Sequence, residues 1–233
     1  MEEERKNALE MGKEKKEKNK ESAKDESRQA LMLMLVVGLD LAGSAKRPTG
    51  FCLMNDKLEC ITKILHSDKE ILKEIAEAKP VIVSIDAPLS LPRGRKGLGD
   101  VNGSKFRKCD IELRNLHIRF FPITLGPMRM LTKRGMSLKK RLERLGFRVA
   151  ESYPGGAQDV LGMPRKQKGL ALLRIALEKY GVRNLRKDAS GDELDAATCA
   201  IVGIEVAKGN ALMLGDASEG QIAMPGVTSK LQG

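Results

Sequence analysis

Hydrophobic and polar positions follow two patterns along the chain. Short extended runs predict strands, and apolar residues that recur every three or four positions predict helices. Three short extended runs come first, over residues 33–41, 50–56 and 58–65. Turn-forming residues divide them, at 43–50 and at 55–56. Because runs this close in sequence pair most simply with their neighbours, we predict an antiparallel three-strand meander.

A helix is predicted next, over Asp68–Ala78, because Ile71 and Ile75 recur at helical spacing. Ser67 is its expected N-cap. Residues 81–86 then form an unbroken, β-branched apolar run, which is typical of a strand that is buried on both faces.

The second half of the chain adds an insert, one more core strand and further helices. Its first part, residues 92–105, is rich in Gly, Lys and Arg and is expected to be a loop. The elements predicted after it are basic helices over 105–119 and 128–145, a strand over 147–152, helices near 156–162, 168–180 and 191–208, and a hairpin joining 211–215 to 220–224.

This order of elements predicts an α/β protein of the ribonuclease H-like fold. We expect a mixed central sheet that contains the three-strand meander, with helices on both faces and a basic helical insert before the last core strand. A doubly wound dinucleotide-binding fold is the weaker alternative. It requires a Gly-x-Gly-x-x-Gly turn after the first strand, and residues 38–43 do not supply one.

The predicted domain spans residues 30–225 and contains the insert at about 92–146. Residues 1–29 are Glu/Lys-rich and almost lack apolar side chains, so we expect a disordered or solvated charged tail. Residues 226–233 are expected to be a loose tail. With 233 residues and only 3% aromatic side chains, the chain has room for one core, which must be mainly aliphatic.

Positive charge is concentrated in one segment. The net charge is +11, yet residues 1–30 carry nine acidic and nine basic side chains, while residues 92–148 carry sixteen Lys/Arg against four Asp/Glu. Such clustering is the electrostatic footprint of nucleic-acid binding, although solubility or an acidic protein partner would also account for it. The residues predicted to bind nucleic acid are Arg107, Lys108, Arg114, Arg129, Lys133, Arg134, Lys139, Lys140 and Arg141.

Membrane insertion and a disulfide framework are not expected. No run approaches the ~20 apolar residues that span a bilayer. The four cysteines include no Cys-x-x-Cys pair, so neither structural zinc nor disulfides are predicted, and a cytoplasmic location fits.

Four carboxylates stand where apolar elements end or begin. Asp40 interrupts the first strand, Asp86 ends the buried strand, Glu151 lies near the end of the last core strand, and Asp195 opens an apolar helix. Each has an ordinary explanation as a turn or surface residue. Because isolated carboxylates are costly to bury, we expect the four to meet and to bind Mg²⁺ or Mn²⁺.

The expected chemistry is phosphodiester cleavage with two divalent ions roughly 4 Å apart. One carboxylate is expected to bind both ions, and we assign this bridging role to Asp40 because its strand is expected to be central. Asp86 and Asp195 would each bind one ion. Glu151 or Asp192 would complete a ligand shell or orient water. Asp192 is explained equally well as a charge that stabilises a helix N-terminus.

Other candidates receive structural interpretations. Asp110 and Glu112 are interpreted as solvated helix charges. Tyr153 is interpreted as a packing residue rather than as a platform for a nucleobase.

Five segments together resemble a family of predicted nucleases of ribonuclease H fold, catalogued as a domain of unknown function (number 429). They are residues 37–43, 84–89, 107–114, 151–155 and 192–196, and the resemblance covers about residues 33–225. It implies a nuclease that uses Asp40, Asp86, Glu151 and Asp195, without indicating a substrate. The Asp-x-x-Asp-Ala of the last helix is also similar to that of Holliday-junction resolvases.

Two other functions stay open at this point. A phosphotransferase of the sugar-kinase-like group would use residues 41–44 as a phosphate loop, but such enzymes usually have a second, duplicated domain, for which this chain is too short. A non-catalytic nucleic-acid-binding module would need the basic insert and no metal.

Overall fold

The structure is a computed structural model, and it describes residues 34–100 and 102–226. The expectations for the N-terminal charged tail, and for the C-terminal tail beyond Gly226, lie outside these residues. Within the described ranges, no helix has the length and apolar character needed to cross a bilayer. The four cysteines are all buried and free.

A seven-stranded sheet forms the centre of the fold, in the order β3-β2-β1-β4-β5-β7-β6. The strands are β1 Val36–Asp40, β2 Thr49–Met54, β3 Cys60–Leu65, β4 Ile82–Asp86, β5 Val149–Ser152, β6 Leu212–Asp216 and β7 Gly220–Met224. β1, β2 and β3 form the predicted antiparallel meander, while β4 pairs parallel to β1 and β5 parallel to β4. This is the ribonuclease H-like arrangement, and the antiparallel β1–β2 pair rules out the doubly wound alternative.

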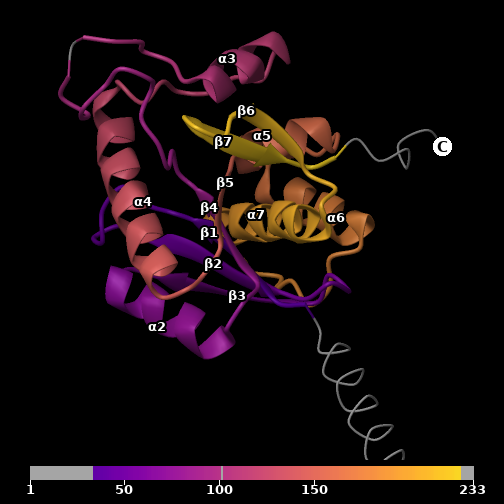
Figure 1. Cartoon of the computed structure of the whole chain (residues 1–233). Coiled ribbons are helices and arrows are strands. Elements are labelled where there is room, and N and C mark those ends of the chain that lie inside the picture. Colours follow the sequence, from indigo (N-terminus) through magenta and orange to yellow (C-terminus); the bar gives the residue numbers. More distant parts are fainter. Residues whose placement is uncertain (1–33, 101, 227–233) are drawn as a thin grey trace, which may run out of the picture. The chain divides into compact units, whose positions relative to one another are not determined.

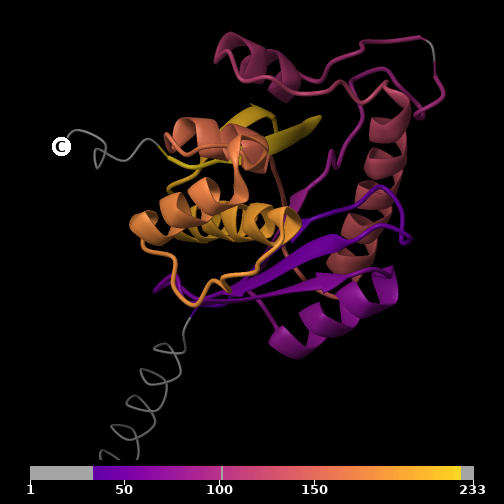
Figure 2. The same cartoon turned by 180° about the vertical axis from the view of Figure 1, so that it is seen from behind.

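Helices cover both faces of the sheet (Figures 1 and 2). They are α2 Asp68–Ala78, α3 Lys108–Asn115, α4 Gly126–Arg144, α5 Pro154–Val160, α6 Leu170–Tyr180 and α7 Gly191–Lys208, with a 3-10 turn η1 at Lys166–Lys168. One apolar cluster joins α6 and α7 to one face of the sheet, and a second joins α2 and α4 to the other. The predicted packing of a mainly aliphatic core on two faces is therefore confirmed.

Local hydrogen bonds explain where the helices begin and end. α2 begins as predicted, because Ser67 and Glu70 cap each other's backbone N–H groups in a capping box. α3 is shorter than predicted. It begins at Lys108 because the Asp110 carboxylate accepts from the backbone N–H of Arg107, at 2.9 Å. It ends before His117, whose φ of +58° is incompatible with a helix.

α7 lies unusually close to β1 and β2, and two glycines permit this. A Cβ atom at Gly38 would overlap the Ala196 carbonyl oxygen, and a Cβ atom at Gly50 would overlap the carbonyl of Asp192. In both cases the obstacle is backbone, which cannot rotate away. The absence of two side chains therefore sets the distance between the first turns of α7 and the end of β1 that carries Asp40.

We predict that Gly38→Ala destabilises the fold by at least about 2–3 kcal/mol, because an added methyl group must push α7 away from the sheet. Urea denaturation measures this loss. The matched control is Gly97→Ala, where an added Cβ has no atom within 4 Å and should change stability by less than about 0.5 kcal/mol. Equal stability of the two variants would show that α7 is free to shift.

Candidate functional site

The ends of β1 and β4 bring two acids side by side. The strands are parallel and adjacent, and their register pairs Asp40 with Asp86. β4 continues the register to β5, so that Ser152 follows on the same row and the same face. The expected neighbourhood of Asp40 and Asp86 is thus found. However, β4 and not β1 is the middle strand of the seven, so strand position gives no reason to assign Asp40 the bridging role.

The first turn of α7 supplies two more acids to this row. Ser190 caps the helix, because its hydroxyl accepts from the N–H of Glu193 and the Glu193 carboxylate accepts from the N–H of Ser190. Asp192 is therefore not needed as a cap. Asp195, three residues later, is 6% exposed and lies on the same side of the helix.

One lysine lies among three of these acids, and no sequence pattern indicated it. The Lys166 ammonium group, from η1, lies 3.0 Å from Asp40 Oδ2, 3.0 Å from Asp192 Oδ1 and 2.8 Å from Asp195 Oδ2. Since Lys166 is one of several basic residues in a loop, far from the acids in sequence, only the folded chain identifies it.

Gln158 of α5 is a second partner that sequence analysis missed. Its side-chain amide is buried and donates to Asp195 Oδ1 at 2.7 Å and to the hydroxyl of Thr198 at 3.2 Å. Asp195 is thereby held from both sides, with one oxygen on the Gln158 amide and the other on the Lys166 ammonium group.

The site carries more negative charge than its lysine neutralises. Burial raises the pKa of Asp40 to about 7; Lys166 opposes this shift, and the charges of Asp195 and Asp192 add to it. Burial, together with the charges of Asp40 and Asp195, raises the pKa of Asp86 well above its usual value. Among the described residues, Asp86 has no hydrogen-bond or ion-pair partner. Burial alone would lower the pKa of Lys166, but the surrounding carboxylates raise it.

The donor set suits a hard divalent cation, because it consists of carboxylate oxygens. In residues 34–100 and 102–226, however, no three His, Cys, Asp or Glu side chains are spaced to hold a metal ion as they stand. Three of the acids surround an ammonium nitrogen at 2.8–3.0 Å, whereas Mg²⁺–oxygen bonds are ~2.0–2.1 Å. Ion binding therefore requires that Lys166 withdraw and that the carboxylates move closer together.

A cavity of about 260 Å³ opens beside the acids. Its lining includes the acids Asp86, Glu151 and Asp195 and, from the insert, Phe120 and Phe121. The insert between β4 and β5 therefore forms part of the wall of the candidate site.

Comparison with known proteins places the chain in a family. Residues 38–219 match the model described as "Protein of unknown function (DUF429)". The chain belongs to this family. Among solved structures, T. thermophilus RuvC in complex with Holliday junction substrate is similar, with 11% sequence identity, coverage of 76% of this chain and 97% of that chain, and a TM-score of 0.47. The comparison with curated proteins found no match.

In this DUF429 protein Glu151 lines the same cavity as Asp86 and Asp195, but its carboxylate pairs with Arg107 rather than with Lys166. Its register partner is Ile85, one residue before Asp86, so its side chain leaves the opposite face of the sheet. There it forms two 2.7 Å hydrogen bonds with the Arg107 guanidinium group and accepts a third from the N–H of Leu89, also at 2.7 Å. A carboxylate that is satisfied in this way has no free oxygen for a metal ion.

Two of the predicted nucleic-acid contacts are buried, which corrects their assignment. Arg107 is 2% exposed and pairs with Glu151 and Asp110, so that Asp110 is not a solvated helix charge either. Arg134 donates to Asp68, at 2.8 Å, and to the carbonyl oxygens of residues 42 and 66. Neither guanidinium group is available to a phosphate.

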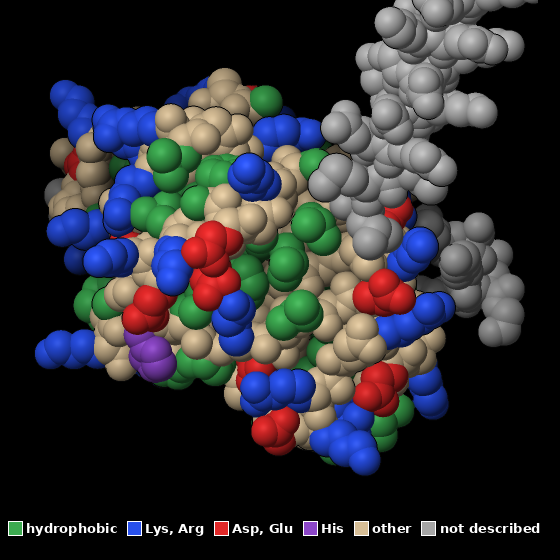
Figure 3. All heavy atoms as spheres, turned by 90° about the horizontal axis from the view of Figure 1, so that it is seen from below, with side chains coloured by type: hydrophobic (Ala, Val, Ile, Leu, Met, Phe, Trp, Pro, Cys, Tyr) green, Lys and Arg blue, Asp and Glu red, His purple; other side chains and the backbone are tan. Residues whose placement is uncertain are grey.

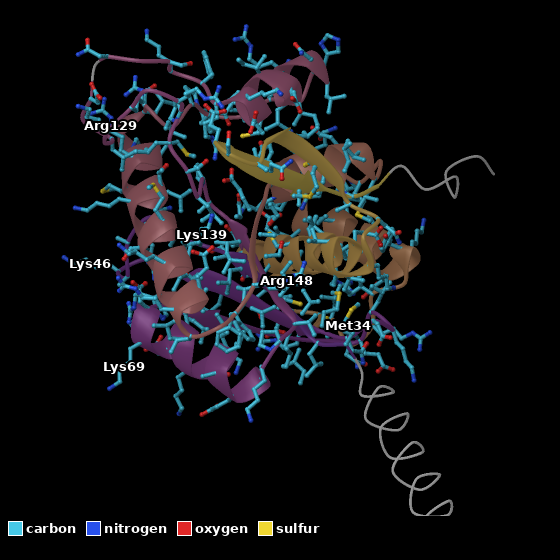
Figure 4. All side chains as sticks on the ribbon, viewed as in Figure 1. Met34, Lys46, Lys69, Arg129, Lys139 and Arg148 are labelled. Atoms are coloured by element: carbon cyan, nitrogen blue, oxygen red, sulfur yellow. The ribbon has the colours of Figure 1, made fainter. Side chains whose placement is uncertain are left out.

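The other predicted basic residues remain at the surface. Lys139 is half-buried, and Lys108, Arg114, Arg129, Lys133, Lys140 and Arg141 are exposed. Figure 4 shows Arg129 and Lys139 along α4, with Lys46 and Lys69 on the same side of the molecule. The last two lie outside the insert and were not predicted. By contrast, the face in Figure 3 carries both signs of charge around a hydrophobic centre.

We predict that Asp86→Asn stabilises the protein without divalent ions. The folded-state pKa of Asp86 lies above its unfolded value, so this carboxyl group costs stability increasingly as pH rises above about 4 and loses its proton. The variant should match wild type near pH 4 and become increasingly more stable than wild type towards pH 8. Thermal melts in EDTA across this range measure the difference, and a variant that is less stable at pH 8 would contradict the account.

We predict that Arg107→Met costs about 3–5 kcal/mol, because it leaves Glu151 and Asp110 buried without their cation. Chemical denaturation measures the loss. Lys108→Met is the matched control, because its side chain is exposed and its removal should cost less than about 0.5 kcal/mol. If the two variants were equally stable, the buried cluster would not hold the insert to the sheet.

Proposed function

We propose that this chain is a metal-dependent nuclease that hydrolyses phosphodiester bonds of nucleic acid. The observation that carries the proposal is the row of acids at the ends of β1 and β4 and the start of α7, whose charge exceeds that of their one internal cation. Asp40, Asp86, Asp192 and Asp195 would hold Mg²⁺ or Mn²⁺. Glu151 is not included, because Arg107 occupies both of its oxygens.

Bound divalent ions would supply Lewis-acid stabilisation of the phosphoryl oxygens and a water of lowered pKa. The chain's own residues prepare the site. Gln158 fixes one oxygen of Asp195, and the two glycines under α7 fix the height of that helix above β1. Lys166 would add a positive charge beside the bound phosphate.

Nucleic acid would be held by the exposed basic side chains on α4 and beside it. Contacts of this kind are made to the phosphate backbone, so we expect binding that is independent of sequence and weakens with salt. The loop after β1 packs on α4, where a Cβ at Gly43 would lie 3.5 Å from the backbone N of Leu131. A nucleic-acid backbone held along α4 would therefore pass close to the acids.

The four free cysteines are compatible with a reducing compartment such as the cytoplasm.

A non-catalytic nucleic-acid-binding module is the second candidate, and Lys166 is the observation that favours it. An ammonium group that bridges three carboxylates reduces the repulsion that a metal ion would otherwise relieve. In such a protein the acids and the lysine would form a structural ion-pair cluster.

We predict cleavage of labelled nucleic acid with Mg²⁺ or Mn²⁺ and none with Ca²⁺, whose larger and looser coordination misplaces the attacking water. A panel of DNA, RNA, hybrid and branched substrates tests this. Asp195→Asn should lower the cleavage rate by at least about 100-fold. Mutation of a residue that only hydrogen-bonds to a metal ligand already lowers metal affinity or activity by about 10–100-fold. Asp188→Asn, at an exposed aspartate in an ion pair with Arg186, is the control and should cut normally.

Calorimetric titration of wild type and Lys166→Met with Mn²⁺ distinguishes the metal-dependent nuclease from the non-catalytic binding module. For a metal-dependent nuclease, Lys166→Met should bind Mn²⁺ more tightly than wild type, because the competing ammonium group is gone. Its melting temperature without metal should fall, because three carboxylates lose their partner. Absence of Mn²⁺ binding in both proteins, together with no cleavage of any substrate, would favour the non-catalytic module.

A further inference from the structure

Aromatic side chains are concentrated at one place on the surface. The chain contains five Phe, two Tyr and no Trp. Four of these seven rings, those of Phe106, Phe120, Phe121 and Tyr153, line a single pocket. Phe121 is 71% exposed, and Phe106 and Phe120 meet edge to face with ring centroids 6.1 Å apart. Phe120 and Tyr153 also pack against an apolar cluster, but packing does not explain the ring of Phe121, which stays exposed.

Three arginines line the same pocket, and none of the described residues that line it is Asp or Glu. The guanidinium group of Arg114 lies 5.2 Å from the ring centroid of Phe106, and that of Arg165 lies 5.5 Å from the ring centroid of Tyr153. Arg119 is the third. The rings offer stacking surfaces for bases, and Arg114 and Arg119 offer positive charge for phosphates, while the charge of Arg165 is paired with Asp159, which does not line the pocket.

This aromatic–arginine pocket lies next to the acidic cavity. Phe120, Phe121, Tyr153 and Arg165 line both hollows. Its volume is about 820 Å³, within the ~300–1,000 Å³ of small-molecule sites. A chain of nucleotides lying in the pocket would therefore lead directly towards Asp86 and Asp195.

We propose that the aromatic–arginine pocket binds unpaired nucleotides next to the acidic site. The inference rests on the proposed function and narrows its substrate class to nucleic acid with single-stranded or unpaired bases. The reason is that base faces are buried by stacking and pairing inside a duplex, whereas unpaired bases can stack on protein rings. An apolar protein segment would gain nothing from the charges of Arg114 and Arg119, which form no ion pair among the described residues, whereas Arg165 is paired with Asp159.

A single substitution provides the probe. Because the chain has no Trp, Phe121→Trp introduces one fluorophore at the most exposed ring of the pocket. Titration with an unlabelled single-stranded oligonucleotide in EDTA, where no cleavage takes place, should quench its fluorescence, and a duplex of the same length should quench it much less. DNA and RNA strands are both used, since both have base faces. Ile61→Trp is the control, at a side chain that is 65% exposed on β3, outside the pocket and the insert.

Binding strength gives a second measurement. By fluorescence anisotropy, Phe121→Ala should weaken single-strand binding by roughly 5- to 150-fold, which corresponds to the ~1–3 kcal/mol of one base–ring stack, and should leave duplex binding unchanged. Phe121→Leu keeps an apolar side chain without a ring, so it should resemble Phe121→Ala. Full binding by Phe121→Leu would overturn the stacking proposal.

The outcomes distinguish this inference from the proposed function. Quenching by single strands without any cleavage would support the pocket and reject the nuclease. Cleavage of duplex and single strands alike, with no effect of the Phe121 substitutions, would reject the pocket and support the nuclease. If Phe121→Ala instead converts a dimer to a monomer in sedimentation measurements, the rings form an interface between copies and the proposal is wrong.

Discussion

The contact between α7 and β1 is the constraint on which the candidate site depends. Gly38 and Gly50 allow helix backbone to lie where side chains would normally stand, and this places the first turn of α7 beside the end of β1. Asp192 and Asp195 then share one ammonium group with Asp40. A wider spacing, with side chains between helix and sheet, would separate these acids. The electrostatics of the site is thus a consequence of packing.

Two groups of buried acids are neutralised in different ways. On one face of the sheet, the planar guanidinium group of Arg107 pairs with Glu151 and Asp110. Both carboxylate oxygens of Glu151 accept a hydrogen bond from it. On the other face, Lys166 offers one point charge to three acids, and Asp86 is left unpaired with a raised pKa. The first cluster is costly to break, because removal of Arg107 would leave two buried carboxylates without a cation, whereas the second retains repulsion that a further cation would relieve.

The strands and the position of Asp40 beside Asp86 followed from the sequence, because apolar runs and turns determine strand order and parallel neighbours end at the same edge. The direction of the Glu151 side chain did not follow, because an error of one residue in register moves a side chain to the other face. Lys166 was missed for another reason. Its partners are 26 to 126 residues away, and no local pattern marks a lysine that folds back onto them.

The positive charge of the insert predicted that its basic residues bind nucleic acid, but some of them have a structural role instead. Its most buried arginine, Arg107, serves to fix the insert to β5, so the basic residues divide into internal partners and exposed ones. Phe120 and Phe121 then extend from this anchored segment over the acids. Because the anchor and the rings belong to one segment, loss of the Arg107 cluster would displace the aromatic–arginine pocket as well as weaken the fold. Under the proposed function, binding of unpaired nucleotides would therefore depend on the stability of the insert.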